Sequence, residues 1–244
     1  MIDRDLVIKK LAEELKNDNS VQAMWLEGAD ANELVDKYSD LDIWIDVKDG
    51  TEKKIIKKVQ TILELMGELD LVSDKKNTHP KILEYVFHLK NSSPFLLIEV
   101  GIQLNSRNFN FIEEFAHEQP KVIFDKKGVI KFSKLNKEEW EKEVSNDIYD
   151  IRDIFRQQSR VKVKRKNFLE VYDSYLKWTI EPLIKMLRIK FCPFKKDYGF
   201  KHLDRDLPKN IVKKIKSLLI IKNVDDIARK QIIVQKWFSK LDEK

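Results

Sequence analysis

The chain has 244 residues, of which 42% are hydrophobic and 36% are charged, and its formal net charge at pH 7 is +6. This length and apolar content suit one large or two ordinary globular domains, and six glycines with six prolines favour helices and short loops over a β-sandwich or a disordered chain. The basic residues are scattered among acids, so we expect no nucleic-acid partner.

Cysteine and histidine usage excludes two kinds of site. The single cysteine, Cys192, cannot form an internal disulfide, and the four histidines lie too far apart in sequence for the usual zinc spacings. Charges occupy the N-terminus where a signal peptide needs an apolar core, and no apolar run is long enough to cross a membrane. We therefore expect a cytoplasmic monomer or homodimer without a membrane partner.

The first half of the chain mixes helix and strand periodicities. The expected elements are a helix over 5–16, strands over 21–27 and 41–47, a helix over 51–66, strands over 81–90 and 95–104, and a hairpin over 122–132 that turns at Gly128. This order predicts a mixed sheet with flanking helices, which is an α/β (α+β) fold.

From residue 136 onward the strand signals stop. Helices are expected over 138–158, 168–191, 208–220 and 225–238. Pro193 and Pro208 are expected at helix boundaries, and Pro182 should kink or interrupt its helix. The sequence thus predicts two domains, 1–140 with the sheet and 141–244 as an all-helical bundle.

Two aspartates stand two positions apart at the start of the strand over 41–47. Side chains with this spacing share one face of a strand, with Cα atoms roughly 6.5 Å apart, so Asp40 and Asp42 could bind one hard cation. The alternative is a solvent-facing acidic edge. Asp46 continues the same face and is a weaker candidate for the site, but a salt bridge or exposure to solvent is the leading expectation for it.

The stretch "GADANELVDKYSDLD", which begins at Gly28, resembles the signature of the polymerase beta-like nucleotidyltransferases. That signature is a glycine and serine after a strand, about ten residues, and then D-x-D on the next strand. Within this superfamily the stretch resembles the aminoglycoside (streptomycin and spectinomycin type) adenylyltransferases and related uncharacterised bacterial nucleotidyltransferases. The phrase "LLIEVGI" resembles the strand that carries a third carboxylate there, which would be Glu99.

The resemblance implies an activity and a set of residues. It implies transfer of a nucleoside monophosphate, most simply AMP from ATP, to a hydroxyl of a small acceptor such as an aminoglycoside-type antibiotic. Asp40, Asp42 and Glu99 would bind two Mg²⁺ ions, with Glu99 completing the metal site or accepting the hydroxyl proton. Gly28, Ala29 and Ser39 would adjoin the nucleotide, as would three cations of the C-terminal half, Lys185, Arg188 and Lys201. These cations could equally form a solvated basic face.

Two departures from the pattern bear on activity. Ala29 stands where the family has its phosphate-binding serine, and Glu33 stands where it has a second glycine. The first change removes a hydrogen-bond donor, and the second places a negative charge near a polyanion. An alternative function is therefore a nucleotide-binding or regulatory module with weakened transfer activity.

Overall fold

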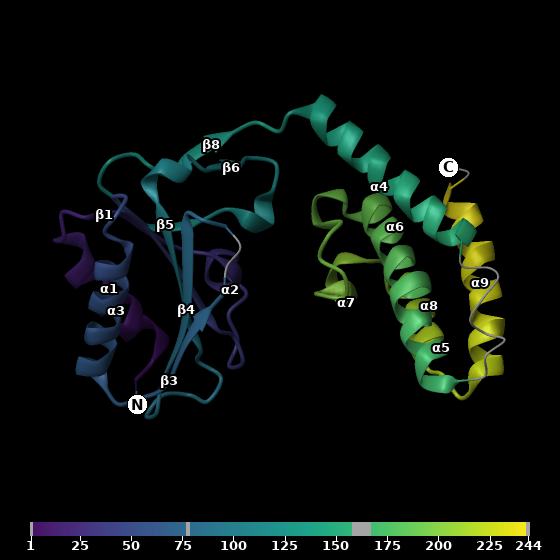
Figure 1. Ribbon diagram of the computed structural model, residues 1–244, viewed down its shortest axis with the longest axis horizontal. Helices are drawn as coiled ribbons and strands as arrows, with labels where there is room; N and C mark the ends of the chain where they lie inside the picture. The colour runs from purple at the N-terminus through teal and green to yellow at the C-terminus, as the bar shows by residue number, and fades with distance from the viewer. Residues whose placement is uncertain (1, 77–78, 158–166, 243–244) are drawn as a thin grey trace. The chain divides into compact units, whose positions relative to one another are not determined.

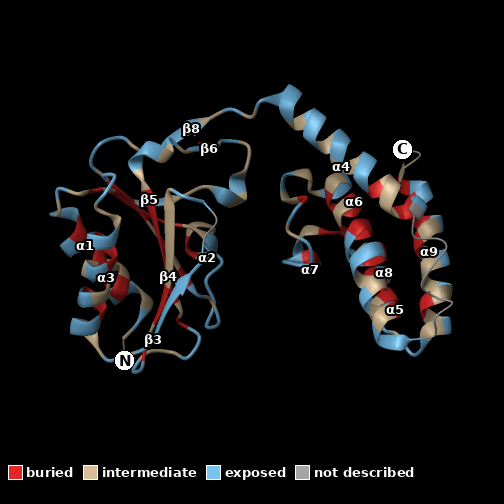
Figure 2. Ribbon diagram, in the orientation of Figure 1, coloured by how far each residue is buried: buried red, intermediate tan, exposed pale blue. Residues whose placement is uncertain are grey.

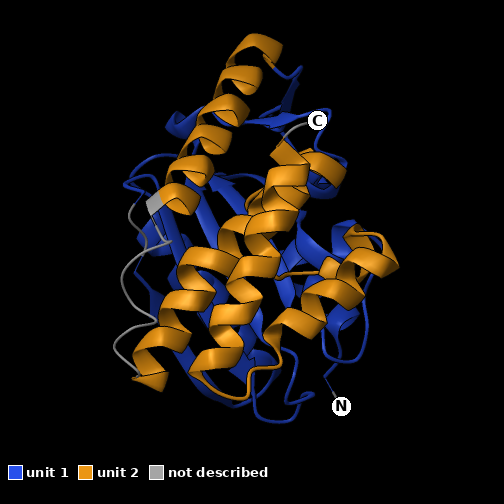
Figure 3. Cartoon of the chain, turned by 90° about the vertical axis from the view of Figure 1, so that its right-hand side faces the viewer, with its two compact units in different colours: residues 1–135 blue, residues 136–244 orange. Residues whose placement is uncertain are grey.

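The computed structural model describes residues 2–76, 79–157 and 167–242, which form two compact units, Met1–Leu135 and Asn136–Lys244 (Figure 3). The elements of the first unit are α1 (Arg4–Lys16), β1 (Val21–Leu26), α2 (Gly28–Ala31), β2 (Leu41–Val47), α3 (Glu52–Met66), β3 (Leu69–Lys75), β4 (Ile82–Leu89), β5 (Ile98–Leu104), η1 (Asn105–Arg107), β6 (Asn110–Ile112), η2 (Ala116–Glu118), β7 (Lys121–Asp125) and β8 (Lys131–Ser133).

Among the described residues of the second unit, the regular elements are all helices. Its elements are α4 (Lys137–Gln157), α5 (Phe168–Tyr175), the π-helical turn η5 (Leu176–Ile180), α6 (Glu181–Phe191), η6 (Pro193–Lys195), α7 (Leu203–Asp206), α8 (Lys209–Leu219) and α9 (Val224–Asp242). Gln158, the last residue of the first helix expected in this half, lies outside the described residues. The expected fold class, a mixed sheet with flanking helices followed by a helical unit, is confirmed (Figure 1).

Six strands of the first unit form one sheet in the order β3-β4-β5-β2-β1-β7. The central pair, β2 with β5, is parallel, and the pairs β3–β4, β4–β5, β1–β2 and β1–β7 are antiparallel. Because parallel neighbours need a long connection, α3, β3 and β4 all lie between β2 and β5 in the sequence.

One face of the sheet is covered by α1 and α3 (Figures 1 and 2). The alternation expected for β2 holds, since Leu41, Ile43 and Ile45 are fully buried in the core that these helices complete. The acidic residues of β2 must therefore project to the opposite face, away from both helices.

Aromatic side chains cover part of this opposite face. Trp25 and Trp44 are register partners whose rings stack 6.2 Å apart, and Phe111 meets Trp25 edge-on. A β carbon at Gly101 would lie 2.7 Å from the Trp44 ring, so only glycine lets the indole lie over β5. These aromatics form a small second core that leaves the strand ends beyond them free for polar groups.

The prediction of a hairpin over 122–132 is wrong. In the structure β7 pairs with β1, whereas β8 pairs in parallel with β6 in a separate two-stranded sheet. The carboxylate of Asp125 accepts hydrogen bonds from the backbone N–H groups of Lys127, Val129 and Ile130. This cap fixes a wider turn, and the chain leaves the large sheet.

The interruption expected at Pro182 is confirmed. Proline lacks the N–H that an α-helix needs, and η5 separates α5 from α6 immediately before it. Pro193 and Pro208 also flank helix ends as expected, since α6 ends at Phe191 and α8 begins at Lys209. Among the described residues, no helix combines the length and the apolar character that a membrane span requires.

Candidate functional site

Three carboxylates lie side by side at one end of β1, β2 and β5. Asp42 and Glu99 are register partners in the parallel central pair, so their Cα atoms are about 5 Å apart and their side chains share a face. Glu27 follows β1, and its backbone N–H donates to the Asp42 carbonyl at 3.1 Å. We call Glu27, Asp42 and Glu99 the acidic row.

Glu27 was not among the residues expected at the site. Its carboxylate accepts a hydrogen bond from Trp25 Nε1 at 2.9 Å, which places it on the face of the sheet that carries the tryptophans. Burial raises the pKa of Glu27, and the Asp42 charge beside it adds to this increase. The sequence signal was the alternation of Ala23, Trp25 and Glu27, which extends the strand by one position.

Gly28 is held against Asp42. Its φ is +61°, and a β carbon at this position would lie 2.1 Å from Asp42 Oδ2. Any other residue would have to adopt a left-handed backbone and would also displace the carboxylate. The glycine therefore brings a backbone segment directly onto one member of the acidic row.

A lysine side chain contacts Glu99, at the other end of the acidic row. Lys75, the last residue of β3, reaches across β4 and places Nζ 2.5 Å from Glu99 Oε2. Burial lowers the pKa of Lys75, but the bond to Glu99 and the nearby Glu84 and Asp42 charges raise it more strongly. Both partners remain partly exposed, at 43% for Lys75 and 30% for Glu99, so solvent and ions can reach the pair.

The loop after Gly28 is tied down by Arg4. This arginine of α1 forms an ion pair with the buried Asp30, which lies in α2, and it also donates to the carbonyl of Ser39. Ala29 lies between Gly28 and Asp30 in the same short helix. Arg4 thus joins both ends of the loop to α1, a role that no local pattern in the sequence indicated.

Near the C-terminal end of this loop, Ser39 and Asp36 form hydrogen bonds with each other. The Ser39 hydroxyl donates to the Asp36 carboxylate at 3.0 Å and accepts from the Asp36 backbone N–H at 2.9 Å. Asp40 is exposed and directly precedes β2. The structure therefore brings Gly28, Asp42 and Glu99 together, places Asp40 at the entrance of β2, and gives Ser39 a role in shaping the loop.

Glu33 has a backbone that favours glycine. Its φ is +55°, a left-handed value that costs most residues about 1–2 kcal/mol. Glycine, which the resembled pattern has at this position, would adopt this backbone without that cost.

The interpretation of Asp46 as a solvent-facing or salt-bridged acid is wrong. Its side chain is 1% exposed and accepts hydrogen bonds from Gln103 Nε2 at 2.8 Å and Asn105 Nδ2 at 3.2 Å. Burial raises its pKa despite these bonds. Neutral amide donors therefore satisfy this carboxylate, and it lies apart from the acidic row.

Arg188, expected at the nucleotide, has an internal role instead. Its side chain is fully buried, and its guanidinium donates to the carbonyls of Gly199 and Lys201 and to Asp206 Oδ2 at 3.2 Å. A planar group with five donors suits such a cage. The arginine organises the segment between α6 and α7, and none of its surface is accessible to a phosphate.

The other two expected cations differ from each other. Lys185 Nζ lies 2.5 Å from Asp147 and 3.0 Å from Asp197, so two acids already neutralise it. Lys201 is exposed, with Nζ 5.9 Å from the centre of the Tyr198 ring. Of the three residues, Lys201 is the most exposed.

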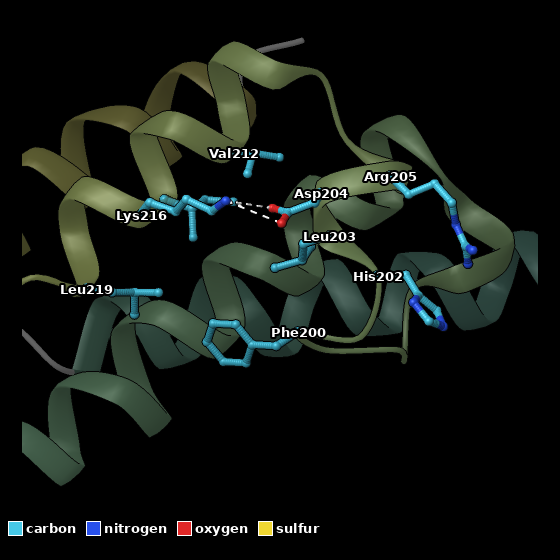
Figure 4. A pocket seen from close by; sticks show the side chains of 9 residues that line it. Phe200, His202, Leu203, Asp204, Arg205, Val212, Lys216 and Leu219 are labelled. Carbon is cyan, nitrogen blue, oxygen red and sulfur yellow. Dashed lines mark hydrogen bonds and ion pairs between the residues drawn. The ribbon is translucent and has the colours of Figure 1, made fainter. Parts of the chain in front are cut away.

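The helical unit also contains a pocket of about 380 Å³ (Figure 4). Its lining consists of Phe200, His202, Leu203, Asp204, Arg205, Val212, Ile215, Lys216 and Leu219. An ion pair of 3.1 Å between Lys216 and Asp204 crosses it, above an apolar floor. Neither Lys185, Arg188 nor Lys201 contributes to this lining.

The donor set of the acidic row fits a magnesium ion that is shared with a substrate. Within the described part of the chain, no group of three or more His, Cys, Asp or Glu side chains is arranged to bind a metal by itself. Mg²⁺, however, is usually bound by one or two carboxylates together with substrate phosphates. Asp42 and Glu99 supply two such carboxylates on one face, and the Lys75 ammonium stands in for a cation there.

No protein-family model and no curated protein sequence matches the chain. Solved structures similar to it include JHP933 from Helicobacter pylori, with 13% identity, a TM-score of 0.32 and coverage of 98% of this chain and 93% of that one. Another is a spectinomycin adenyltransferase from Enterococcus faecialis, crystallised with ATP and spectinomycin, with 12% identity, a TM-score of 0.34 and coverage of 96% and 98%. Both TM-scores lie below 0.5.

Proposed function

We propose that this protein is a Mg²⁺-dependent nucleotidyltransferase that moves a nucleoside monophosphate, most simply AMP from ATP, to a hydroxyl of a small molecule. The observation that supports it most directly is the pairing of Asp42 with Glu99 on adjacent parallel strands, with Gly28 packed against Asp42. The nucleotidyltransferase pattern of the sequence assigns these three residues to metal and phosphate, and they lie together.

The roles of the residues follow from their chemistry. Asp42 and Glu99 would bind Mg²⁺, and Gly28 allows backbone to approach the phosphates without a side chain in between. When bound, the ion neutralises charge on the triphosphate and on the leaving pyrophosphate. Asp40, exposed beside Asp42, is the next carboxylate available to the metal.

Glu99 has an alternative role in the proposed reaction, as the base rather than as a metal ligand. The acceptor oxygen forms a bond to the α-phosphorus while the bond from that phosphorus to the bridging oxygen breaks, and pyrophosphate leaves. The hydroxyl proton passes to the carboxylate of Glu99, which requires the two oxygens to approach within about 3 Å. Glu99 is partly exposed, as a general base that meets a second substrate must be.

A nucleotide-binding module without transfer activity is the second candidate. Ala29 lacks the hydroxyl of the family serine, and Glu33 adds a negative charge to the loop. In addition, Glu99 already forms an ion pair with Lys75. A protein of this kind would bind the nucleotide and leave it intact.

One experiment separates the two functions. The full chain is incubated with ATP labelled at the α-phosphate, Mg²⁺ and a panel of aminoglycosides, spectinomycin and lincosamides, and labelled products are separated by chromatography. Calorimetry with a non-hydrolysable ATP analogue is run in parallel. Transfer that disappears in Asp42→Asn supports the enzyme, binding without transfer to any acceptor supports the module, and the absence of both contradicts the proposed fold-related function altogether.

A further inference from the structure

The ion pair between Lys75 and Glu99 joins a cation to the carboxylate that the proposed reaction needs most. It differs from the other lysine ion pairs of this sheet because of where it lies. Lys90, for example, pairs with Glu68 at 2.9 Å. These two residues lie just after β4 and just before β3, several register positions away from the acidic row. Lys75 instead spans β4 to reach β5, and the acids around its ammonium are Glu99, Glu84 and Asp42.

We propose that Lys75 is a positioning residue that competes with the divalent metal for Glu99, so that metal binding has to displace its ammonium. This inference rests on the proposed function, because it concerns the same carboxylate. An ammonium 2.5 Å from a carboxylate oxygen occupies the space and the charge that a metal ion would take. The two cations cannot both bind that oxygen.

The exposure of the pair makes the exchange physically reasonable. Ion pairs in contact with solvent contribute little to stability, so opening this one has a small cost. Lys75 is the terminal residue of an edge strand, and its long side chain can move without disturbing the core. Once released, the ammonium remains next to the acidic row, where it can contact the phosphates that arrive with the metal.

The competition can be measured with Mn²⁺ alone, using the full chain and electron paramagnetic resonance of the free ion, with no nucleotide present. Two carboxylates completed by water bind a divalent ion weakly, so the titration extends to ion concentrations high enough to detect weak binding. Lys75→Met should tighten Mn²⁺ binding by about fivefold or more, because it removes a unit charge in contact with a ligand. Lys75→Arg keeps the charge and should bind like the parent. Lys90→Met is the matched control, since it opens an exposed ion pair outside the acidic row and should change nothing.

Thermal unfolding of each variant shows whether the fold is preserved. An equal or weaker affinity in Lys75→Met, or no binding by any of the four chains, would overturn the competition. The proposed function is judged separately, by transfer of the labelled nucleotide in the parent chain. A tighter Mn²⁺ affinity shared by Lys90→Met would also count against Lys75, because it would reflect net charge rather than position.

Discussion

Asp42 and Glu99 are direct register partners on β2 and β5, although two strands and a helix separate them in the sequence. The contact is set by the backbone ladder of the sheet centre and not by the side chains themselves. Whatever the two carboxylates bind is therefore held by the most buried and best paired part of the first unit.

Asp42→Asn should weaken binding of an ATP analogue with Mg²⁺ by at least about tenfold, since even indirect partners of a metal ion are worth this much. The fold should remain intact because Asp42 projects away from the helix-covered core. Calorimetry measures the affinity. Asp225→Asn, an exposed acid in the first turn of α9, makes the same change in charge. If both variants bind like the parent, Asp42 belongs only to a solvated strand edge.

Gly28→Ala should abolish this binding and destabilise the first unit by more than the left-handed backbone alone, about 1–2 kcal/mol, because the new methyl group overlaps Asp42 Oδ2. Gly128→Ala is the matched control. Its φ is +64° and nothing lies within 4 Å of the added carbon. The variant should therefore lose only the stability that the left-handed backbone costs, and it should bind normally. Urea unfolding and calorimetry test both, and equal losses of stability would contradict the close packing of Gly28 on Asp42.

Glu33→Gly should raise the free energy of unfolding by about 0.5–1 kcal/mol. Relief of the left-handed backbone, about 1–2 kcal/mol, exceeds the loss from a more flexible unfolded chain, about 0.4–1 kcal/mol. Glu33→Ala removes the charge but keeps the strain, so it should show no such gain. If the charge repels the nucleotide, both variants should bind ATP more tightly, and an unchanged affinity in both would place Glu33 away from the phosphates.

Asp18 should make the first unit sensitive to acid. A hydrogen bond from the Ser20 backbone N–H, and after it the ion pair with Lys58, lower the pKa of Asp18 from 3.8 to about 2. A lowered folded-state pKa stabilises the protein above pH 3.8, and this contribution is lost as the pH falls toward 2. Asp18→Asn should therefore cost about 1 kcal/mol at neutral pH, with allowance for solvent screening, and only a small fraction of that near pH 2.

Chemical unfolding of the parent and of Asp18→Asn across this pH range measures the difference. Lys58→Met is a useful companion, because it leaves the larger contribution, the hydrogen bond from Ser20, in place. It should retain most of the acid sensitivity. A stability difference between the parent and Asp18→Asn that stays constant with pH would show that the carboxylate has a normal pKa in the folded chain.

Elements with a strong periodicity in the sequence were predictable. Elements and contacts that depend on pairing with a distant segment of the chain were not. The alternation of β2 fixed which face carries Asp42, and the prolines fixed helix ends. The strand β3 was missed because an exposed edge strand has no buried face to impose a pattern, with six of its seven residues exposed. For the same reason nothing in the sequence placed Lys75 near Glu99.

Charged residues were predicted least well where they are buried. Arg188 and Asp46 were interpreted as surface groups because arginine and aspartate are seldom fully buried without partners. Their partners, the carbonyls of Gly199 and Lys201 and the amides of Gln103 and Asn105, come from separate segments. Such cages depend on how the chain folds back on itself, and a linear pattern does not reveal them.

The parallel pairing of β2 with β5 also bears on how the chain folds. The pair cannot close until the long connection between its strands has been spanned, and contacts of this sequence separation form slowly. A partly folded chain in which only the three consecutive antiparallel strands β3, β4 and β5 have paired would present Glu99 without Asp42. A ligand held by both carboxylates can therefore recognise only chains that have completed the sheet, and its binding would shift the equilibrium from incomplete intermediates toward the finished protein.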